Sequence, residues 1–303
     1  MATTSVSNFT ISAADVSWGR RERTCVTSIV GTSLDAKSFN LDAPASNGGA
    51  SAAFYVWFDT GASIDPATAG RTGIQVIVDT GDTAAEVATL AVAAIDGNAN
   101  FRAIDNADGT FIIENTFFGD VTAATVDVDS SMTFDQQRSG VGGDLGTTSG
   151  GVSAAFEITT IEVKADQTGE ALRDKFITGT KATVTMSLLE MTAARWSDVV
   201  GSVSGDNFTP SGGTKLTGFG ESRAYASMFD LSGELILHPT KNAASNKAED
   251  LTFWLTAPIP SSYNFSGTDV SVMEVTFEAL IDQEKETAIN LFAYGDGSQD
   301  VQV

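Results

Sequence analysis

The sequence predicts a mainly β protein with short helices, built as a host domain that carries a small α+β domain as an insertion. Two observations lead to this fold class. Short segments in which apolar and polar residues alternate recur along the chain, separated by turns rich in Gly, Pro and Ser, as half-buried strands require. The composition also changes at about residues 32 and 151. Residues 1–31 and 152–303 are therefore assigned to the host and residues 32–151 to the insertion.

The insertion differs from its flanks in charge and in the way it joins them. Residues 32–151 contain a single lysine, Lys37, and are rich in Ala, Thr, Gly and Asp. The stretch 139–153, SGVGGDLGTTSGGVS, has the small-residue composition of a flexible joint. A segment of this kind is expected to fold as a separate unit.

Two strands are expected early in the insertion. The segment 52–58, AAFYVWF, is apolar at successive positions, which predicts a strand buried on both faces. In the segment 72–80, TGIQVIVDT, the residues Ile74, Val76 and Val78 form one apolar face, which predicts a second strand.

A helix and a hairpin follow these strands. Thr83 and Glu86 have the spacing of a capping box, and the helix that they open is expected to end at Gly97. Its predicted buried face is formed by Val87, Leu90, Ala91, Ala94 and Ile95. Residues 101–115, FRAIDNADGTFIIEN, predict a β-hairpin with an Asp-Gly turn.

The second part of the host domain alternates short strands with turns. Residues 182–190, ATVTMSLLE, predict a strand whose apolar face is formed by Val184, Met186 and Leu188. Residues 191–201 predict a short helix whose inward side chains are Trp196, Val199 and Val200. Residues 202–225 follow no regular pattern, and a loop of this length predicts a functional role.

The most regular strand pattern lies in residues 272–282, VMEVTFEALID. The residues expected to face a core are Val275, Phe277, Ala279 and Ile281. Those expected to face away are Glu274, Thr276, Glu278 and Asp282. One face of this strand is therefore predicted to be acidic.

The charge and the cysteine content exclude several classes of protein. A net charge of −22, from 39 acidic and 17 basic residues, predicts a surface that repels nucleic acid and anionic lipid. No apolar run has the length of a membrane span, and the N-terminal segment lacks the basic and apolar parts of a secretory signal. The lone cysteine, Cys25, excludes a disulfide framework within one subunit and is expected to be small, apolar and buried.

The motifs that suggest catalysis are better explained as structural. Asp-Thr-Gly occurs at Asp59 and at Asp79, but an aspartic protease takes its two carboxylates from symmetry-related lobes or subunits. Both motifs are expected to be strand-end turns, although a homodimer with one motif per chain stays open. The single histidine, His238, precedes Pro239 at a strand end and is expected to be structural. We therefore expect no enzymatic activity, no cofactor and no metal site.

Several segments of the host domain resemble bacteriophage tail tube proteins. Residues 162–201, EVKADQTGEALRDKFITGTKATVTMSLLEMTAARWSDVVG, resemble the core of that family, in which a strand leads into a DQ-x-G turn, a TG pair opens the next strand and a helix follows. Residues 237–258, LHPTKNAASNKAEDLTFWLTAP, and 291–296, LFAYGD, are similar to later segments, and SWG at 17–19 suits the first strand. Within the insertion, three segments resemble a module common in phage structural proteins, namely residues 54–59, 65–76 and 81–95.

The resemblance implies a β-sandwich or barrel with one helix that assembles as a homo-hexamer into stacked rings. In that family the inner sheets join into a β-lined channel through which DNA passes without specific binding. The expected location is the virion tail, assembled in the host cytoplasm with the tape measure, terminator and distal tail proteins and without a membrane. The insertion has no room inside such a channel, so it is expected on the outside of a long, non-contractile tail.

Two sets of residues are candidates for these roles. Acidic groups lining the bore would repel phosphate and keep the wall from binding DNA. The candidates for this lining are Glu274, Glu278, Asp282, Glu157, Glu162 and Glu234, and the alternative for each is a solvated outer sheet face. The loop 202–225 is expected to pack on an adjoining subunit or ring through Phe208, Leu216 and Phe219. The alternative function is a receptor- or carbohydrate-binding tail or baseplate component whose inserted domain is the active part.

Overall fold

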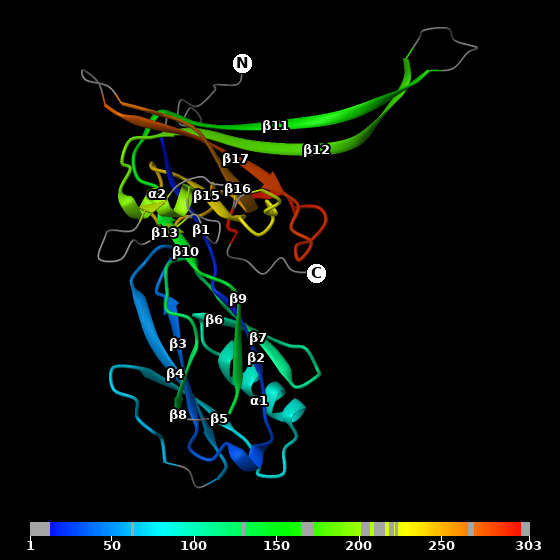
Figure 1. The fold of residues 1–303 in the computed structure, drawn as a ribbon. Coiled ribbons are helices and arrows are strands. Elements are labelled where there is room, and N and C mark those ends of the chain that lie inside the picture. The colour runs from blue at the N-terminus through cyan, green and yellow to red at the C-terminus, as the bar shows by residue number, and fades with distance from the viewer. Residues whose placement is uncertain are drawn as a thin grey trace, which may run out of the picture. The chain divides into compact units, whose positions relative to one another are not determined.

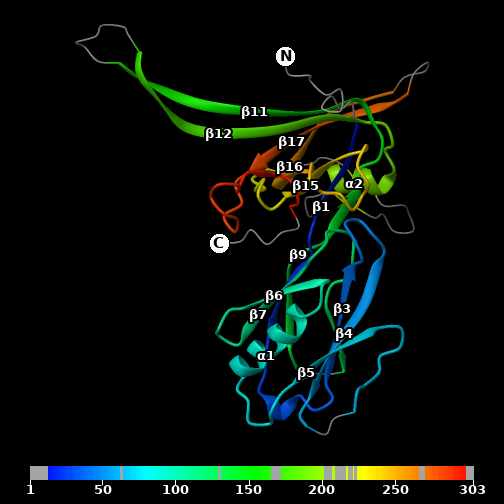
Figure 2. The ribbon, with the colours of Figure 1, turned by 180° about the vertical axis from the view of Figure 1, so that it is seen from behind.

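The structure, a computed structural model, describes residues 13–61, 64–128, 131–164, 172–200, 207–208, 216–217, 221, 224–265 and 270–297. It is mainly β, with two α-helices in the described ranges, as the sequence predicts (Figures 1 and 2). The chain forms two compact units. Unit 1 consists of Met1–Val16 and Leu145–Val303, and unit 2 is the continuous segment Ser17–Asp144.

The boundaries of the inserted unit lie earlier in the sequence than residues 32 and 151. Strand β2 (Arg23–Thr27) pairs with two strands of unit 2, so the segment after Val16 belongs to that unit rather than to the host. The stretch 139–153, expected to be a flexible joint, instead contains strand β10 (Val141–Asp144) and the start of β11 (Thr148–Lys164). Leu145 donates its N–H to the Val16 carbonyl at 2.9 Å, so the two ends of the insertion leave unit 1 side by side.

Unit 2 consists of two four-stranded sheets and one helix, α1 (Ala84–Asp96). The first sheet has the order β6-β7-β2-β9, with β6 at Phe101–Asp105, β7 at Thr110–Asn115 and β9 at Thr133–Arg138. The second has the order β5-β4-β3-β8, with β5 at Thr72–Ile77, β4 at Ser51–Asp59, β3 at Ser38–Pro44 and β8 at Thr125–Val128. A short 3-10 helix, η2, spans Gly31–Ser33.

The core of unit 2 is formed by side chains from both sheets and from α1. Strand β4 is buried on both faces, and Ile74, Val76 and Val78 point inward, as predicted. The capping box of Thr83 and Glu86 is present. The buried face of α1 is formed by Val87, Ala88, Ala91 and Ile95. Ala88 takes the place predicted for Leu90, because its spacing of three residues from Ala91 and seven from Ile95 puts it on the same helix face. Leu90 is 38% exposed.

The predicted hairpin and the lone cysteine lie in the first sheet. Strands β6 and β7 pair antiparallel from Phe101↔Asn115 to Asp105↔Phe111, and Ala107 and Gly109 adopt positive φ in the turn. Cys25 is only half-buried, because β2 points its neighbouring side chains, not this one, into the core. The expectation of a buried cysteine was wrong in this respect.

Unit 1 is built on one sheet with the order β1-β15-β16-β17-β12-β11. Its strands are β1 (Ala14–Arg20), β15 (Gly233–Pro239), β16 (Leu251–Asn264), β17 (Val272–Leu280), β12 (Leu172–Leu188) and β11, and β18 (Phe292–Tyr294) pairs with β16. The unit also contains helix α2 (Ala193–Val200) and the paired strands β13 (Asn207–Phe208) and β14 (Leu216–Thr217). The second half of β1 belongs to unit 2, where it pairs with β10.

Most of the predicted core positions of unit 1 are buried. The confirmed positions are Val184, Met186, Leu188, Val199, Val200, Val275, Phe277 and Ala279. Ile281 was expected to be inward but is 54% exposed, because β17 ends at Leu280 and the alternation stops there. Trp196 is half-buried, with its ring 5.6 Å from that of Tyr263 in an edge-on contact.

Two glycines allow β1 and β10 to approach closely. Gly19 pairs with Gly142, and Gly142 has φ of +97°. A Cβ atom on Gly142 would lie 2.2 Å from the Trp18 carbonyl oxygen, and one on Gly19 would lie 2.4 Å from the Val141 carbonyl oxygen. Backbone atoms cannot move out of the way cheaply, so only glycine is expected to fit at these positions.

We predict that Gly142→Ala lowers the free energy of unfolding by about 2 kcal/mol or more, because it combines positive φ with a backbone clash. Gly81→Ala is the matched control, since a Cβ atom there meets nothing within 4 Å. Thermal and denaturant unfolding of both variants measures the difference. Equal stabilities would contradict the assigned pairing of β1 with β10.

Candidate functional site: a strand arm and an acidic sheet face

The most unusual feature of unit 1 is a long two-stranded ribbon. Strands β11 and β12 pair antiparallel from Thr148↔Leu188 to Lys164↔Leu172, whereas β17 pairs with β12 only from Thr183 to Leu188. Residues 156–164 and 172–182, here called the arm, therefore have no third strand beside them among the described residues (Figures 1 and 2). A two-stranded ribbon alone is only marginally stable in water.

The arm is highly exposed and carries large apolar side chains. Of its side chains that the structure describes, only Gly179 and Ala182 are not classed as exposed. Six large apolar residues expose between 36% and 65% of their surface: Phe156, Ile158, Ile161, Val163, Phe176 and Ile177. Scattered apolar residues are normal on a protein surface, but a group of this size on one ribbon indicates an interaction surface.

A β-bulge separates these six side chains into two clusters on opposite faces. Thr159 pairs with Gly179 and Thr160 with Ile177, so Thr178 is the extra residue of β12. By strand alternation, cluster A shares one face and consists of Phe156, Ile158 and Ile177. Cluster B lies on the other face and consists of Ile161, Val163 and Phe176.

Cluster A begins at the core of unit 1. The Phe156 ring lies 4.7 Å from that of Phe292 and is stacked at 6.4 Å on the fully buried Phe253. The apolar face of the sheet thus continues outward along the arm, past the last side chains of unit 1 that cover it.

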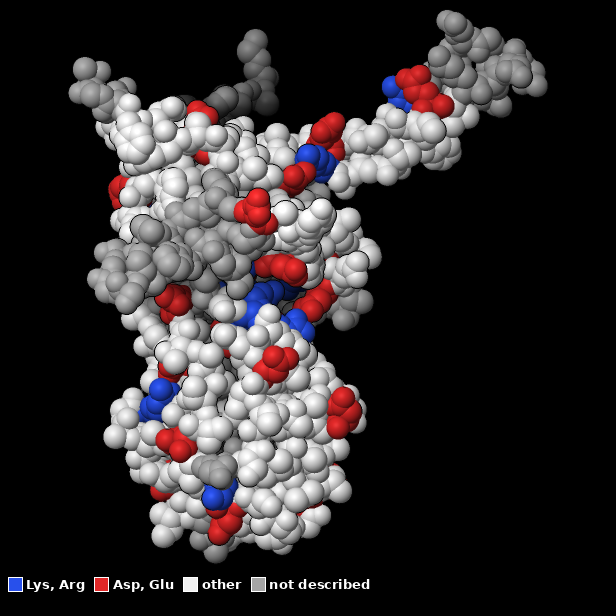
Figure 3. All heavy atoms as spheres, viewed as in Figure 1, with Lys and Arg blue, Asp and Glu red and all other residues white. Residues whose placement is uncertain are grey.

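Two lysines of the arm form ion pairs, one within the arm and one with β17. Lys175 forms an ion pair with Glu162 at 2.9 Å, and Lys181 forms one with Glu278 of β17 at 2.6 Å. Hydrogen bonding and attraction to Glu278 raise the pKa of Lys181, and Glu157 adds to the attraction. Figure 3 shows the charged groups along the arm in two clusters of mixed sign, separated by uncharged side chains.

The acidic face predicted for β17 is present at two of its positions. Glu274 and Glu278 point away from the core, while Val275 and Phe277 are buried. Glu274 accepts a hydrogen bond from Ser262 at 3.1 Å. Glu157 faces Lys181 across the arm and shares the face of Glu278, so this polar surface extends over β17, β12 and β11.

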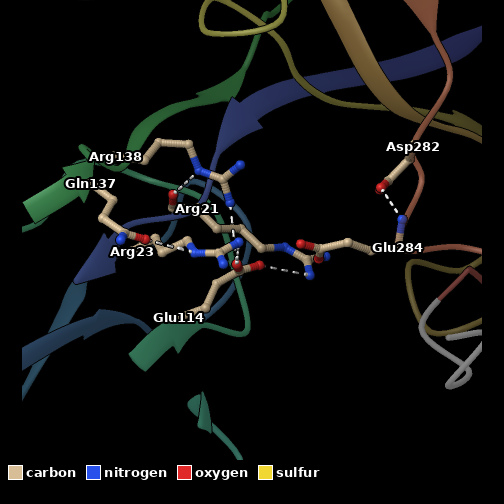
Figure 4. Close-up of polar contacts among 7 residues, drawn as sticks. All are labelled: Arg21, Arg23, Glu114, Gln137, Arg138, Asp282 and Glu284. Atoms are coloured by element: carbon tan, nitrogen blue, oxygen red, sulfur yellow. Dashed lines mark hydrogen bonds and ion pairs between the residues drawn. The ribbon is translucent and has the colours of Figure 1, made fainter. Parts of the chain in front are cut away.

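The other predicted acidic residues lie elsewhere. Asp282 lies in the turn after β17, where its side chain accepts a hydrogen bond from the Glu284 N–H (Figure 4). Glu162 lies on the opposite face of the arm from Glu157, by the alternation of β11. Glu234 lies on β15, two strands from β17, but on the same face of the sheet as Glu278, because Gly233 pairs with Thr256 and Thr256 pairs with Ala279.

The structure describes two of the three residues predicted to anchor the loop 202–225. Phe208 and Leu216 are paired with each other in the two-residue strands β13 and β14, which shows local structure in a segment without a sequence pattern. Phe219 lies outside the described residues.

The residues that suggested catalysis take part in structural hydrogen bonds. The Asp59 carboxylate accepts from the Gly61 N–H at 2.8 Å and from the Gln75 side chain at 2.8 Å, which confirms the turn at this motif. The Asp79 N–H donates to Asp82, ahead of the capping box. His238 Nδ1 lies 2.6 Å from Asp250 Oδ1, and this contact joins β15 to the start of β16.

Unit 2 contains a charged row, centred on the buried Glu114, that the sequence pattern does not indicate. Glu114, 7% exposed, lies 3.3 Å from Arg138, 3.7 Å from Arg23 and 4.0 Å from Arg21 (Figure 4). Arg23 faces Glu114 on β7 and Arg138 on β9, so the row crosses three neighbouring strands. Its role is to hold the first sheet together, since each charge is paired across a strand boundary.

Glu22 is a second buried carboxyl beside this row, and folding raises its pKa. It is 4% exposed, and burial raises its pKa above the ordinary 4.5, although hydrogen bonds from Thr24 and Gln136 lower it. The Glu114 charge raises the pKa further, and Arg138 lowers it.

Comparison with known proteins assigns no family. No family model matches the chain, and no curated protein is similar to it in sequence. In the described ranges, no three or more His, Cys, Asp or Glu side chains are arranged to hold a metal ion. Neither described helix is long and apolar enough to cross a membrane.

The spacing of the apolar residues in the sequence is itself a signal for the arm. In AAFEITTIEVK the apolar residues Phe156 and Ile158 are two positions apart, the next interval is three, and Ile161 and Val163 are again two apart. A change of parity within a strand moves the apolar side chains to the opposite face, and this is the pattern of clusters A and B.

We predict that Glu22→Gln raises the stability of the protein at neutral pH. A carboxyl whose pKa is raised by folding contributes stability that is present below its unfolded pKa and is lost as pH rises through the folded pKa. The advantage of the amide should therefore shrink as pH falls from neutral through the raised pKa of Glu22, and it should be lost below about 4.5. Chemical denaturation between acidic and neutral pH measures it.

Glu114→Gln is the contrasting control, and we expect it to lower stability at neutral pH because three guanidinium groups lose their carboxylate. The assignment of Glu22 would be wrong if both substitutions destabilised the protein to the same extent at neutral pH.

Proposed function

We propose that this chain is a structural subunit of a bacteriophage tail tube and that it assembles as hexameric rings stacked around a channel for DNA. The observation that carries the proposal is the arm. A ribbon with two unpaired edges and apolar side chains on both faces requires other molecules to complete it, and a self-assembling subunit provides them. The resemblance of residues 162–201 to tail tube proteins supports the same role.

The acidic face of β17 supports the second part of the proposal. In a ring, the polar face with Glu157, Glu274 and Glu278 would line the bore, and its carboxylates would repel DNA phosphates. Glu162 and Asp282 are not assigned to this lining, because Glu162 lies on the opposite face of the arm and Asp282 lies in the turn after β17. Glu234 shares the face of Glu278 and stays a candidate.

The remaining parts of the proposal follow from the same role. The chain catalyses no reaction, and its partners are further copies of itself and the tape measure, terminator and distal tail proteins. It is located in the virion tail, with DNA in transient, non-specific passage. The inserted unit decorates the outside of a long, non-contractile tail.

Electron microscopy and analytical ultracentrifugation of the purified full chain test the proposal. We expect six-membered rings that stack into tubes as the concentration rises, because every copy carries an arm with free strand edges and exposed apolar side chains. Discrete trimers would instead favour the receptor- or carbohydrate-binding alternative. A monomer at every concentration would rule out self-assembly.

A charge reversal tests the lining. In Glu274→Lys/Thr276→Lys, both changes lie on the acidic face and leave the Lys181–Glu278 ion pair intact. We expect its tubes to retain short duplex DNA at low salt and release it as the salt concentration rises, while parent tubes retain none. The measurement is co-sedimentation of labelled DNA.

Glu286→Lys/Thr287→Lys is the matched control, since it makes the same charge change at two exposed residues of a turn. Equal DNA retention by the two variants would show that the β17 face does not line the channel.

A further inference from the structure

Unit 2 has a groove that neither the arm nor the acidic face of β17 involves. The groove has a volume of about 430 Å³ and lies between the end of β5 and the first two turns of α1. Apolar and acidic side chains both contribute to its wall, which includes Ile77, Val78, Asp79, Asp82, Glu86 and Leu90. Three properties of this groove identify what it can bind.

The first property is a strand edge with unpaired backbone groups. Strand β5 is the last strand of its sheet and pairs only with β4 among the described residues. The Val78 N–H donates to the Asp59 carbonyl at 2.9 Å, so the backbone of Val78 faces β4. Because backbone groups alternate in direction along a strand, those of Gln75 and Ile77 point away from β4. An added strand would pair with these groups.

The second property is a pair of exposed apolar side chains. Ile77 is 67% exposed on the face of β5 opposite the core, and Leu90 is 38% exposed on the second turn of α1. The two residues belong to different elements, yet both line the groove. Covering them removes apolar surface from water, which favours an occupant with aliphatic groups.

The third property is the charge. Asp79, Asp82 and Glu86 line the groove, and residues 72–101 contain no Lys or Arg. Hydrogen bonds from Thr83 lower the pKa of Glu86, so this carboxylate remains charged at mildly acidic pH. Basic side chains would be attracted here, whereas a second copy of this chain, with its net charge of −22, would be repelled.

We infer that the groove between β5 and α1 binds an extended peptide segment of a partner protein in which basic and aliphatic residues alternate. The segment adds a strand to β5 through the backbone of Gln75 and Ile77. Successive side chains of an added strand face opposite sides of the sheet. The aliphatic ones lie beside Ile77, and the basic ones face α1, where the stem of a Lys or Arg covers Leu90 and its charged end approaches Glu86.

This inference goes beyond the proposed tube function. It gives unit 2 a binding role that does not require the chain to assemble. A free cation could neutralise the carboxylates but would leave the strand edge and Ile77 uncovered, so the combination of all three properties favours a peptide.

Titration of a fluorescent peptide into the purified full chain tests the inference. The probe is Lys-Val-Lys-Val-Lys-Val-Lys with capped ends, and fluorescence anisotropy measures its dissociation constant. One control peptide has Glu in place of every Lys, and the other keeps the sequence but is N-methylated at its backbone amides. We expect the probe to bind about tenfold or more tightly than either control, because one control lacks the charge and the other lacks the donors for strand pairing.

Hydrogen exchange of the same complex locates the peptide. The probe should slow the exchange of the amides of residues 73–77, since the outward N–H groups of β5 become hydrogen-bonded. The N-methylated peptide should leave this exchange unchanged.

Two single substitutions remove one property of the groove each. Ile77→Thr removes apolar surface and Asp79→Asn removes a charge, and each should weaken binding of the probe by about threefold or more. We expect neither to lower the melting temperature, because Ile77 is exposed and Asp79 contacts Asp82 through its backbone N–H. The matched controls are Val126→Thr, on the opposite edge strand β8, and Asp120→Asn, at an exposed position outside the groove.

Four results would overturn the inference. The probe might show no binding at about 1 mM, or the N-methylated peptide might bind as tightly as the probe, in which case no strand is added. Equal binding of the Glu peptide would show that the carboxylates do not select the occupant. Equal weakening by Asp120→Asn and Asp79→Asn would assign the attraction to the net charge of the chain. Ring assembly is measured separately, so the proposed function can stand or fall independently of these results.

Discussion

The architecture of unit 1 depends on the pairing of β11 with β12 far beyond the point where β17 stops. Within the sheet, β12 has a neighbour on each side and buries Val184, Met186 and Leu188. From Ala182 back to Leu172 it has β11 alone, and apart from Phe156 and Ala182 at the base the large side chains that the structure describes there are exposed. Hydrophobic burial drives sheet stability, so a ribbon that keeps large apolar side chains in water is stable only as part of something larger.

The charged residues are distributed unevenly over the molecule, which the net charge alone does not show. A chain with net charge −22 could be uniformly acidic, yet its arm is close to neutral, and in unit 2 three partly exposed arginines surround the buried Glu114. Buried charges are tolerated only when they are paired, and here the pairs bridge adjacent strands. The unpaired acidic excess lies outside these two places. A net charge of this size favours solubility through mutual repulsion.

Much of the local structure could be predicted from the sequence because it depends on near neighbours. The capping box at Thr83, the alternation of Val275 and Phe277, and the turn at Asp59 all follow from residues a few positions apart. The unit boundary could not be placed in this way, because it depends on β2 pairing with strands that lie many residues later. The glycines near residue 142 were interpreted as flexible for the same reason. Their requirement is close approach to Trp18, a partner more than a hundred positions away.

The candidate site was predicted in part. Glu274 and Glu278 were found because strand alternation is a short-range property, whereas Asp282 was misplaced because the pattern does not show where β17 ends. The arm was missed because its side chains look like ordinary strand residues until the number of neighbouring strands is known. Only the three-residue interval between Ile158 and Ile161 indicated that the ribbon changes its apolar face.

The hydrogen bond from Leu145 to Val16 has an evolutionary consequence. The chain leaves unit 1 and returns to it at adjacent points, so the host fold can close over that gap whatever lies between. A module with neighbouring ends can be lost, gained or exchanged for another by recombination without disturbing the strands that accept it. Related chains would then be free to keep unit 1 while varying unit 2 independently.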